Sequence, residues 1–226
     1  MALAISWTSA AFVKRHQRRA IRRIREARFP RVKTLEGFDA VGFDFRRNPA
    51  LPEVRLRRLF NGDYINAAET VLLVGAPGTG KTHLASALGV AAAQQGRRVR
   101  FVTAGQLVCA LTEARNALQL RREVTRFARP ELLILDELGY LPLSKTDAEL
   151  LFQVLSERTE KRALVVTTNL PFSEWTQVFP DARLCRAVVD RLTHRCHIID
   201  TGTKSIRLEE ALRRSAGTAA GTGSVP

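Results

Sequence analysis

Gly75-Ala-Pro-Gly-Thr-Gly-Lys81-Thr82 is the stretch that decides the fold of this chain. A short apolar segment, 70–74, precedes it, and a segment typical of a helix, 81–95, follows it. A strand that runs into G-x-x-x-x-G-K-[ST] and then into a helix is the setting of a phosphate-binding loop. The glycine spacing does not fit the G-x-G-x-x-G pattern of dinucleotide-binding folds. We therefore expect a P-loop protein that binds ATP.

Each residue type in this loop has an expected task. The glycines let the backbone turn tightly, so that its N–H groups face the phosphates. Lys81 can reach the β- and γ-phosphates, and the hydroxyl of Thr82 can bind Mg²⁺. The predicted nucleotide-binding residues of the loop are Gly75, Ala76, Pro77, Gly78, Thr79, Gly80, Lys81, Thr82 and His83.

Two acidic residues follow a second apolar segment, Leu-Leu-Ile-Leu at 132–135. A buried strand there would bring Asp136 to the edge of the sheet beside the phosphate loop. Asp136 is expected to hold Mg²⁺ through water, and Glu137 to act as general base on the attacking water. The alternative is a pair of acids that caps a helix after a strand.

Polar and basic residues near a third apolar segment, 163–168, complete the candidate site. Asn169 follows this segment and can orient the attacking water, or it is an ordinary turn residue. Hydrolysis also needs positive charge on the transition state, often from an arginine of a neighbouring subunit. The candidates are Arg183, Arg186, Arg191, Arg195 and Arg207, each of which can equally be a surface arginine.

Strand-like and helix-like segments alternate between residues 34 and 214, which predicts a parallel sheet covered by helices on both faces. This α/β segment is expected to be a single nucleotide-binding module. The segment 215–226 is rich in Ala, Gly, Thr and Ser and is expected to be disordered. The expected strands are 70–74, 99–103, 132–135, 163–168, 196–200 and 205–208, and the expected helices are 81–95, 104–127 with a break near Asn116, 145–161, 173–178 and 184–194.

The chain is strongly basic, with 36 Lys and Arg against 22 Asp and Glu and a formal net charge of +14. Such an excess favours a polyanionic partner, most often nucleic acid, over an acidic lipid surface. Ten of the basic residues lie between Lys14 and Lys33, where Glu26 is the only acid. We expect residues 1–33 to be a basic arm, helical from 14 until Pro30 stops the helix. It is interpreted as a DNA-contacting arm rather than a merely solvated one, with Arg15, Arg18, Arg19, Arg22 and Arg23 as the candidate contacts.

Three cysteines, an odd number without a C-x-x-C pair, indicate a reducing cytoplasm rather than a disulfide framework. No apolar run is long enough to cross a bilayer, so we expect no membrane partner.

In this order, the motifs resemble the AAA+ ATPases of the IstB-like group, the helper ATPases of insertion-sequence transposition, which are relatives of the helicase loader DnaC. The resemblance covers about 18–211. Its stretches are ARFPRVKTLEGFD (27–39), GAPGTGKTHLASALG (75–89), RPELLILDELGYLPL (129–143), VTTNLPFSEWTQVF (166–179) and VVDRLTHRCHIIDTGTKSIR (188–207).

The resemblance implies specific roles. Asn169 looks like the sensor-1 residue, Arg191 like the arginine finger with Arg195 as second choice, and Arg207 like an arginine that touches nucleotide, although Ile206 replaces the usual tyrosine before it. Residues 1–12 do not resemble the longer helical segment usual in the group, and the part after Asn169 is too short for a full helical lid.

The function implied is that of an ATPase that assembles on duplex DNA into an ATP-dependent oligomer and recruits an integrase-type transposase. The alternatives are a loader of a replicative helicase, a nucleotide-gated DNA-binding scaffold with little turnover, and a decayed transposon remnant.

Overall fold

Five parallel strands form the centre of the molecule, in the order β2-β3-β4-β1-β5. The computed structural model describes residues 3–30, 51–203 and 205, and side chains from Lys14 onward. β1 pairs with β4 on one side and with β5 on the other, so the strand that leads into the phosphate loop is interior. The strands are β1 (Thr70–Val74), β2 (Val99–Thr103), β3 (Leu132–Leu138), β4 (Ala163–Thr168) and β5 (Cys196–Asp200).

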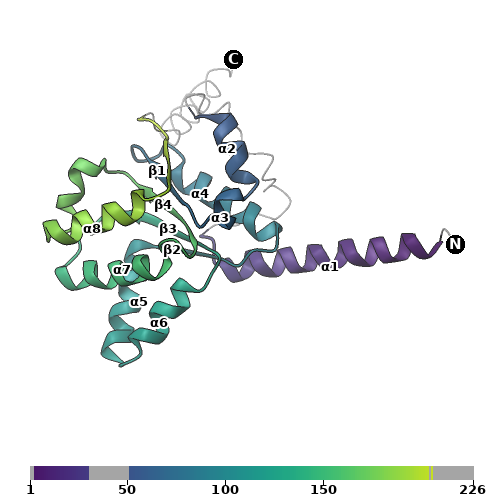
Figure 1. The fold of residues 1–226 in the computed structure, drawn as a ribbon, viewed down its shortest axis with the longest axis horizontal. Coiled ribbons are helices and arrows are strands. Elements are labelled where there is room, and N and C mark those ends of the chain that lie inside the picture. Colours follow the sequence, from purple (N-terminus) through teal and green to yellow (C-terminus); the bar gives the residue numbers. More distant parts are fainter. Residues whose placement is uncertain (1–2, 31–50, 204, 206–226) are drawn as a thin grey trace, which may run out of the picture.

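Helices cover both faces of this sheet, as Figure 1 shows. One face carries α1 (Leu3–Ala27), α2 (Glu53–Phe60), α3 (Asp63–Asn66) and α4 (Lys81–Gln94). The other carries α5 (Ala104–Asn116), α6 (Leu120–Ala128), α7 (Lys145–Arg158), the short 3-10 helix η3 (Phe172–Gln177) and α8 (Ala182–Thr193).

Side-chain alternation along the strands separates the two halves of the core. In β1, Leu72 packs with the residues of α5 to α8, whereas Val71 and Leu73 pack with those of α1 to α4. Successive residues of a strand point to opposite faces, and both faces of a parallel sheet are buried, which is why these segments are continuously apolar. The predicted α/β architecture, a parallel sheet between two layers of helices, is confirmed.

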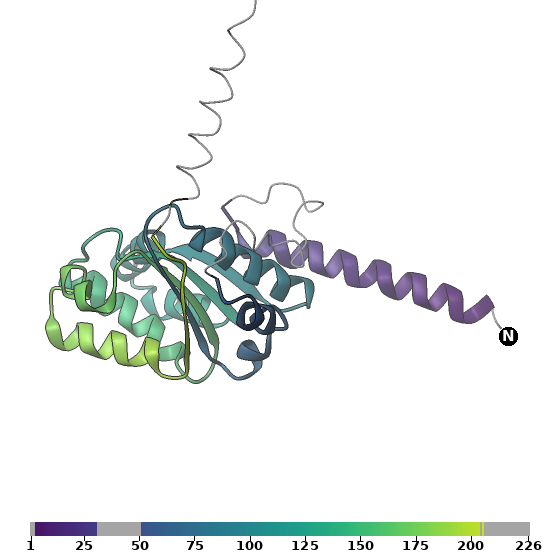
Figure 2. The same ribbon diagram turned by 90° about the horizontal axis from the view of Figure 1, so that it is seen from above.

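The amino-terminal helix is longer than the sequence indicates and packs on the body at its end. α1 begins at Leu3, not at Lys14, because the preceding residues contain no glycine or proline to interrupt it. It ends at Ala27, where Arg28 takes a left-handed conformation with φ 60°. Ile24 and Ala27 are buried in the α4 half of the core. The rest of α1 projects away from the sheet (Figure 2).

Other boundaries differ by a few residues. β3 extends to Leu138, past the predicted end, with an irregular register against β4 between Leu135 and Leu138. The predicted break near Asn116 is confirmed, since α5 ends there. The helices α2 and α3 were not among the predicted helices. The predicted strand 205–208 and the tail 215–226 lie outside the described residues, apart from Ser205.

Candidate functional site

The phosphate loop lies at the carboxyl end of β1, between Val74 and the first residue of α4, Lys81. Gly80 precedes the helix with φ 94°, and Gly78 has φ 85°. Both values lie in the left-handed region, where a residue with a Cβ atom is strained. The loop therefore takes its shape from glycine at these two positions, and the amino end of α4 points its N–H groups toward it.

The side chain of Lys81, at the end of the loop, folds back toward the start of the loop. Its ammonium group donates hydrogen bonds to the carbonyl oxygens of Gly75 at 2.7 Å and Ala76 at 2.8 Å. These contacts hold a positive charge beside the concave side of the loop, where phosphate oxygens would be its strongest partners. The predicted phosphate-binding position of Lys81 thus fits the geometry.

A segment after β5 packs against the loop, and no motif in the sequence predicts this contact. The N–H of Ala76 donates to the carbonyl of Gly202 at 3.0 Å, and the hydroxyls of Thr79 and Thr201 are 2.7 Å apart. A Cβ atom on Gly78 would lie 2.2 Å from Oγ of Ser205. The loop is therefore bound to residues more than one hundred positions later in the chain, which spacing alone does not reveal.

Asp136 lies beside the loop, as the sequence predicts. Its carboxylate is buried, with the residue 2% exposed. Oδ1 accepts hydrogen bonds from the hydroxyl of Thr82 at 3.1 Å and from that of Thr167. A hydroxyl and a carboxylate from adjacent elements are the hard oxygen donors that Mg²⁺ prefers, and Mg²⁺ bound with a nucleotide needs only one or two protein ligands. The pair therefore fits a magnesium ion.

Glu137 is exposed next to the buried aspartate. Its φ is 60°, and its backbone N–H donates to Oγ1 of Thr167 at 2.9 Å. This backbone kink coincides with the irregular stretch of β3 and turns the Glu137 side chain outward. An exposed carboxylate one residue from the candidate Mg²⁺ ligand can act on a water molecule at the γ-phosphate.

Asn169 lies at the same edge of the sheet. It follows the last residue of β4, Thr168, which pairs with Leu138 of β3, and it is half-buried. The hydroxyl of Thr168 accepts a hydrogen bond from the N–H of Leu170 at 3.2 Å, which turns the chain directly after Asn169. The structure thus brings together the loop, the two acids and this amide.

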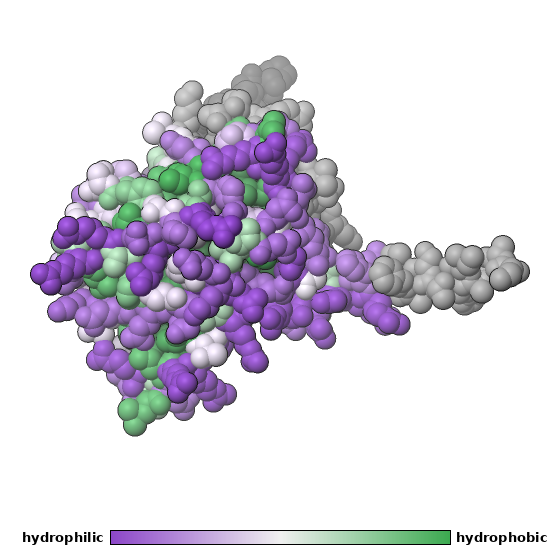
Figure 3. Space-filling view, viewed as in Figure 1, coloured by the Kyte–Doolittle hydropathy of each residue, from purple (hydrophilic) through white to green (hydrophobic). Residues whose placement is uncertain are grey.

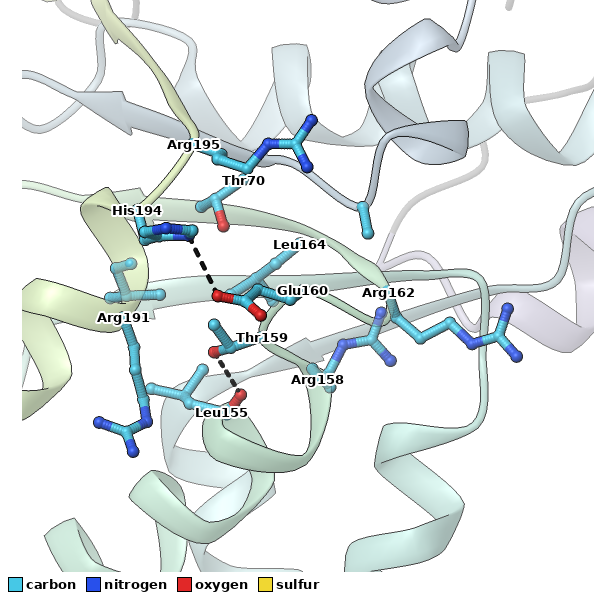
Figure 4. A pocket seen from close by; sticks show the side chains of 12 residues that line it. Thr70, Leu155, Arg158, Thr159, Glu160, Arg162, Leu164, Arg191, His194 and Arg195 are labelled. Carbon is cyan, nitrogen blue, oxygen red and sulfur yellow. Dashed lines mark hydrogen bonds and ion pairs between the residues drawn. The ribbon is translucent and has the colours of Figure 1, made fainter.

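Arg191 lies at the opposite ends of the strands, where β1 and β4 begin. It is in the last turn of α8, its guanidinium group 4.3 Å from the centre of the Phe152 ring. The carbonyl of nearby Arg195 accepts from the N–H of Thr70, the first residue of β1. A parallel strand rises about 3.3 Å per residue, so the two ends of β1 are roughly 15 Å apart. Figure 4 shows the side chains of Arg191 and Arg195 pointing away from each other.

Arg195, the second choice, makes an ion pair with Glu69 at 3.4 Å. Neither arginine therefore reaches the phosphate loop of its own chain. The exposed His83 lies in the first turn of α4, next to Thr82, whereas Arg207 lies outside the described residues.

The candidate DNA contacts occupy the part of α1 that leads into the body. Arg15, Arg18, Arg19 and Arg22 are exposed. Arg23 is different: its side chain is 19% exposed and pairs with Glu26 at 3.0 Å. Most of the visible surface is hydrophilic (Figure 3), and none of the described helices is long and apolar enough to span a bilayer.

Comparison with known proteins adds a family to this geometry. Residues 9–214 match the family of IstB-like ATP binding proteins. An ATP-binding protein of insertion sequence IS21 from Pseudomonas aeruginosa is 39% identical over 217 residues, which are 96% of this chain and 77% of that protein. An ATP-binding protein of insertion sequence IS5376 from Geobacillus stearothermophilus is 36% identical over 201 residues, 89% of this chain and 78% of that protein.

Solved structures share the fold at lower identity. The DnaC helicase loader aligns with a TM-score of 0.56 and 23% identity, over 65% of this chain and 86% of that one. AMPPCP-bound DnaA from Aquifex aeolicus aligns with a TM-score of 0.62 and 18% identity, over 78% of this chain and 55% of that one. These likenesses identify the fold as that of the AAA+ P-loop proteins.

Proposed function

The chain belongs to the family of IstB-like ATP-binding proteins, and we propose that it is a DNA-stimulated ATPase that helps a transposase to act on target DNA. The observation that carries the proposal is the meeting of Lys81, Thr82, Asp136 and Glu137 at one edge of the sheet, with an exposed basic helix on the same molecule.

In the proposed reaction, the loop N–H groups and Lys81 bind the β- and γ-phosphates of ATP. Mg²⁺ would be held by the hydroxyl of Thr82 and, through water, by Asp136, and it supplies positive charge to the phosphate oxygens. Glu137 accepts a proton from the attacking water, and Asn169 orients that water from the neighbouring strand.

The proposed site is completed by a second copy of the chain. Arg191 lies at the amino ends of the strands, whereas the phosphate loop lies at their carboxyl ends. An arginine at this position therefore serves a neighbour's ATP more readily than its own. This arrangement makes hydrolysis depend on ATP-bound subunits assembling side by side, and DNA gathers such subunits along its backbone. Arg195 is the alternative donor.

DNA contact is assigned to the exposed arginines of α1. The charge lies on one projecting helix and is suited to phosphates rather than to base edges, so binding would be independent of sequence. The partner of the assembly would be an integrase-type transposase, in keeping with the insertion-sequence names of the relatives.

The test of the proposal is phosphate release from ATP and Mg²⁺, measured with and without duplex DNA. The wild-type chain should show DNA-stimulated turnover, whereas Lys81→Ala should lose ATP binding by about 100-fold or more, because the phosphates lose a fixed counter-charge. Lys145→Ala, which removes an exposed lysine from the start of α7, is the control and should behave as wild type.

Two outcomes would point elsewhere. ATP-dependent DNA binding without turnover would indicate a nucleotide-gated scaffold. Stimulation by a replicative helicase but not by a transposase would indicate a helicase loader.

A further inference from the structure

A basic hollow of about 440 Å³ lies between α6 and the end of α7. Arg121 and Arg129 line it from α6 and the residue that follows it, and Lys161 and Arg162 line it from the turn after α7. All four side chains belong to exposed residues. Glu157 is the one acid in the lining.

The positive charge of this hollow is largely unneutralised. Glu157 pairs with Lys161 at 3.7 Å. Within the part of the chain that the structure describes, the side chains of Arg121, Arg129 and Arg162 form no ion pair. Like charges this close repel one another, and only a bound anion or bulk ions can offset the repulsion.

A buried arginine next to the hollow adds to this charge. Arg158 is 1% exposed and donates to the carbonyl oxygens of Phe127, Ala128 and Pro130, each at 3.0 Å, and to that of Ala163. Among the described residues its hydrogen-bond partners are all carbonyls, so its charge is not cancelled. Burial, followed by the charge of Arg162, lowers the pKa of Arg158 to about 9, which leaves it charged at neutral pH. Figure 4 shows the Arg158 and Arg162 side chains close together.

Helix dipoles do not account for these cations. Basic residues near a helix carboxyl end commonly stabilise its free carbonyls. Here Arg158 already donates to the last carbonyls of α6, Phe127 and Ala128. Arg121 lies in the first turn of α6, where a positive charge is unfavourable for the dipole.

The basic surface continues from α6 toward α1. Arg126, on the next face of α6, and Arg28, just after α1, are both close enough to Arg100 of the edge strand β2 to lower its pKa, after the larger effect of burial. Arg28, Arg100 and Arg126 therefore lie between the exposed arginines of α1 and the cations of α6, together with Glu123, which pairs with Arg126 at 3.1 Å and offsets part of this charge.

We propose that the hollow between α6 and α7, lined by Arg121, Arg129, Lys161 and Arg162, is a second contact surface for the phosphate backbone of duplex DNA, in addition to α1. This inference rests on the DNA binding in the proposed function. The surface lies near the amino ends of the strands, where α6 and α7 end. ATP and DNA would therefore occupy opposite ends of the strands in the same module.

The size of the surface favours a polyanion over a single phosphate. Arg121 and Arg129 are eight positions apart, which is roughly 12 Å along a helix. Each strand of a duplex carries one phosphate per about 3.4 Å of its axis, so several phosphates lie within this span. One small anion cannot meet cations at both ends of it.

The experiment measures how salt changes the affinity of the full chain for duplex DNA. Binding is monitored by fluorescence anisotropy of the DNA in the presence of a non-hydrolysable ATP analogue. The hollow variant combines three substitutions in the lining of the hollow, Arg129→Gln, Lys161→Gln and Arg162→Gln. The matched control combines Arg58→Gln, Arg115→Gln and Lys145→Gln, three exposed basic residues on α2, α5 and α7 with the same total charge. A third variant, Arg15→Gln, Arg18→Gln and Arg22→Gln, reports on α1. Thermal unfolding checks that all variants are folded.

The hollow variant should bind DNA about tenfold or more weakly. The slope of its plot of log K against log salt should become less steep by about two to three units, because each lost phosphate contact reduces the slope by about 0.9. The control should change the slope by less than about one unit. Inorganic phosphate at matched ionic strength should not compete better than chloride.

Three results would contradict the proposal in different ways. If the salt dependence of DNA binding falls equally in the hollow variant and the control, and falls further in the α1 variant, the hollow is not a DNA surface, although the proposed function stands. If inorganic phosphate competes specifically, the hollow holds a small anion instead. If the wild-type chain binds no duplex DNA, the DNA-binding part of the proposed function fails with it.

Discussion

The hydroxyl of Thr167 donates a hydrogen bond to Oδ1 of Asp136, across 31 positions of the chain. The hydroxyl oxygen of Thr167, Oγ1, in turn accepts a hydrogen bond from the backbone N–H of Glu137 at 2.9 Å. One buried side chain of β4 thus orients the candidate Mg²⁺ ligand and the backbone of the candidate base together. Because Asp136 is also bonded to Thr82, the hydroxyl connects β4 to the phosphate loop through the aspartate.

Replacing Thr167 by valine keeps the shape of the side chain and removes this hydroxyl. Turnover of ATP should fall by roughly 10- to 100-fold, because the aspartate and Glu137 lose a shared hydrogen bond worth about 1–3 kcal/mol. Binding of ATP without Mg²⁺ should change little. Phosphate release and calorimetric titration measure the two effects. Thr146→Val in the first turn of α7 is the control, and equal losses in both variants would remove Thr167 from the site.

Glu137→Gln separates binding from chemistry. The amide keeps the size and polarity of the side chain but cannot accept the proton, so turnover should drop by about 10²- to 10⁴-fold while ATP binds normally. Complexes with DNA that depend on ATP should last longer as a result. Glu149→Gln, on the exposed face of α7, should hydrolyse ATP as wild type does. A wild-type rate in Glu137→Gln would assign the base to another residue.

The position of Arg191 predicts that activity depends on assembly. Specific activity should rise with protein concentration and rise further with DNA, because an arginine supplied by a neighbour is worth about 10³–10⁵ in rate. Arg191→Ala should bind ATP almost normally and hydrolyse it poorly. Its stacking on Phe152 contributes little to stability at a half-exposed site, so the variant should remain folded.

A mixing experiment distinguishes a neighbour's arginine from the chain's own. Arg191→Ala subunits keep an intact phosphate loop, and Lys81→Ala subunits keep an intact arginine. Mixed on DNA, with co-assembly confirmed by crosslinking, the two inactive variants should recover part of the activity at shared interfaces. Full activity of Arg191→Ala alone, or no recovery in the mixture, would favour Arg195, which the same design tests.

Gly89 in the middle of α4 predicts a cost in stability. A Cβ atom there would lie 2.5 Å from Cδ1 of Ile134 in β3 and 2.7 Å from the ring of Phe29. Gly89→Ala should lower the free energy of unfolding by about 1–3 kcal/mol, as overpacked cores do. Gly105→Ala is the matched control, because nothing lies within 4 Å of its added Cβ, and it should be neutral or stabilising by up to about 1 kcal/mol. Denaturant titration measures both.

Much of the fold was predictable because its signals are local. The apolar segments before Gly75 and Asp136 form interior strands, and glycines of the phosphate loop have the backbone angles that their residue type suggests. Helix ends were less predictable. α1 continues back to Leu3, and its terminal Ile24 is buried against α4, because a helix that is basic overall still has enough apolar surface to pack at one end.

The sequence by itself determined the P-loop fold, the identity of the loop residues and the two acids near the end of β3, since each depends on residue types at fixed spacing. Only the tertiary structure decided what surrounds them. Thr167 meets Asp136 because β4 lies beside β3, and Thr201 supports Thr79 because β5 lies beside β1. Arg191 is separated from its own loop by the length of a strand. These relationships depend on the order of strands in the sheet, which local sequence does not encode.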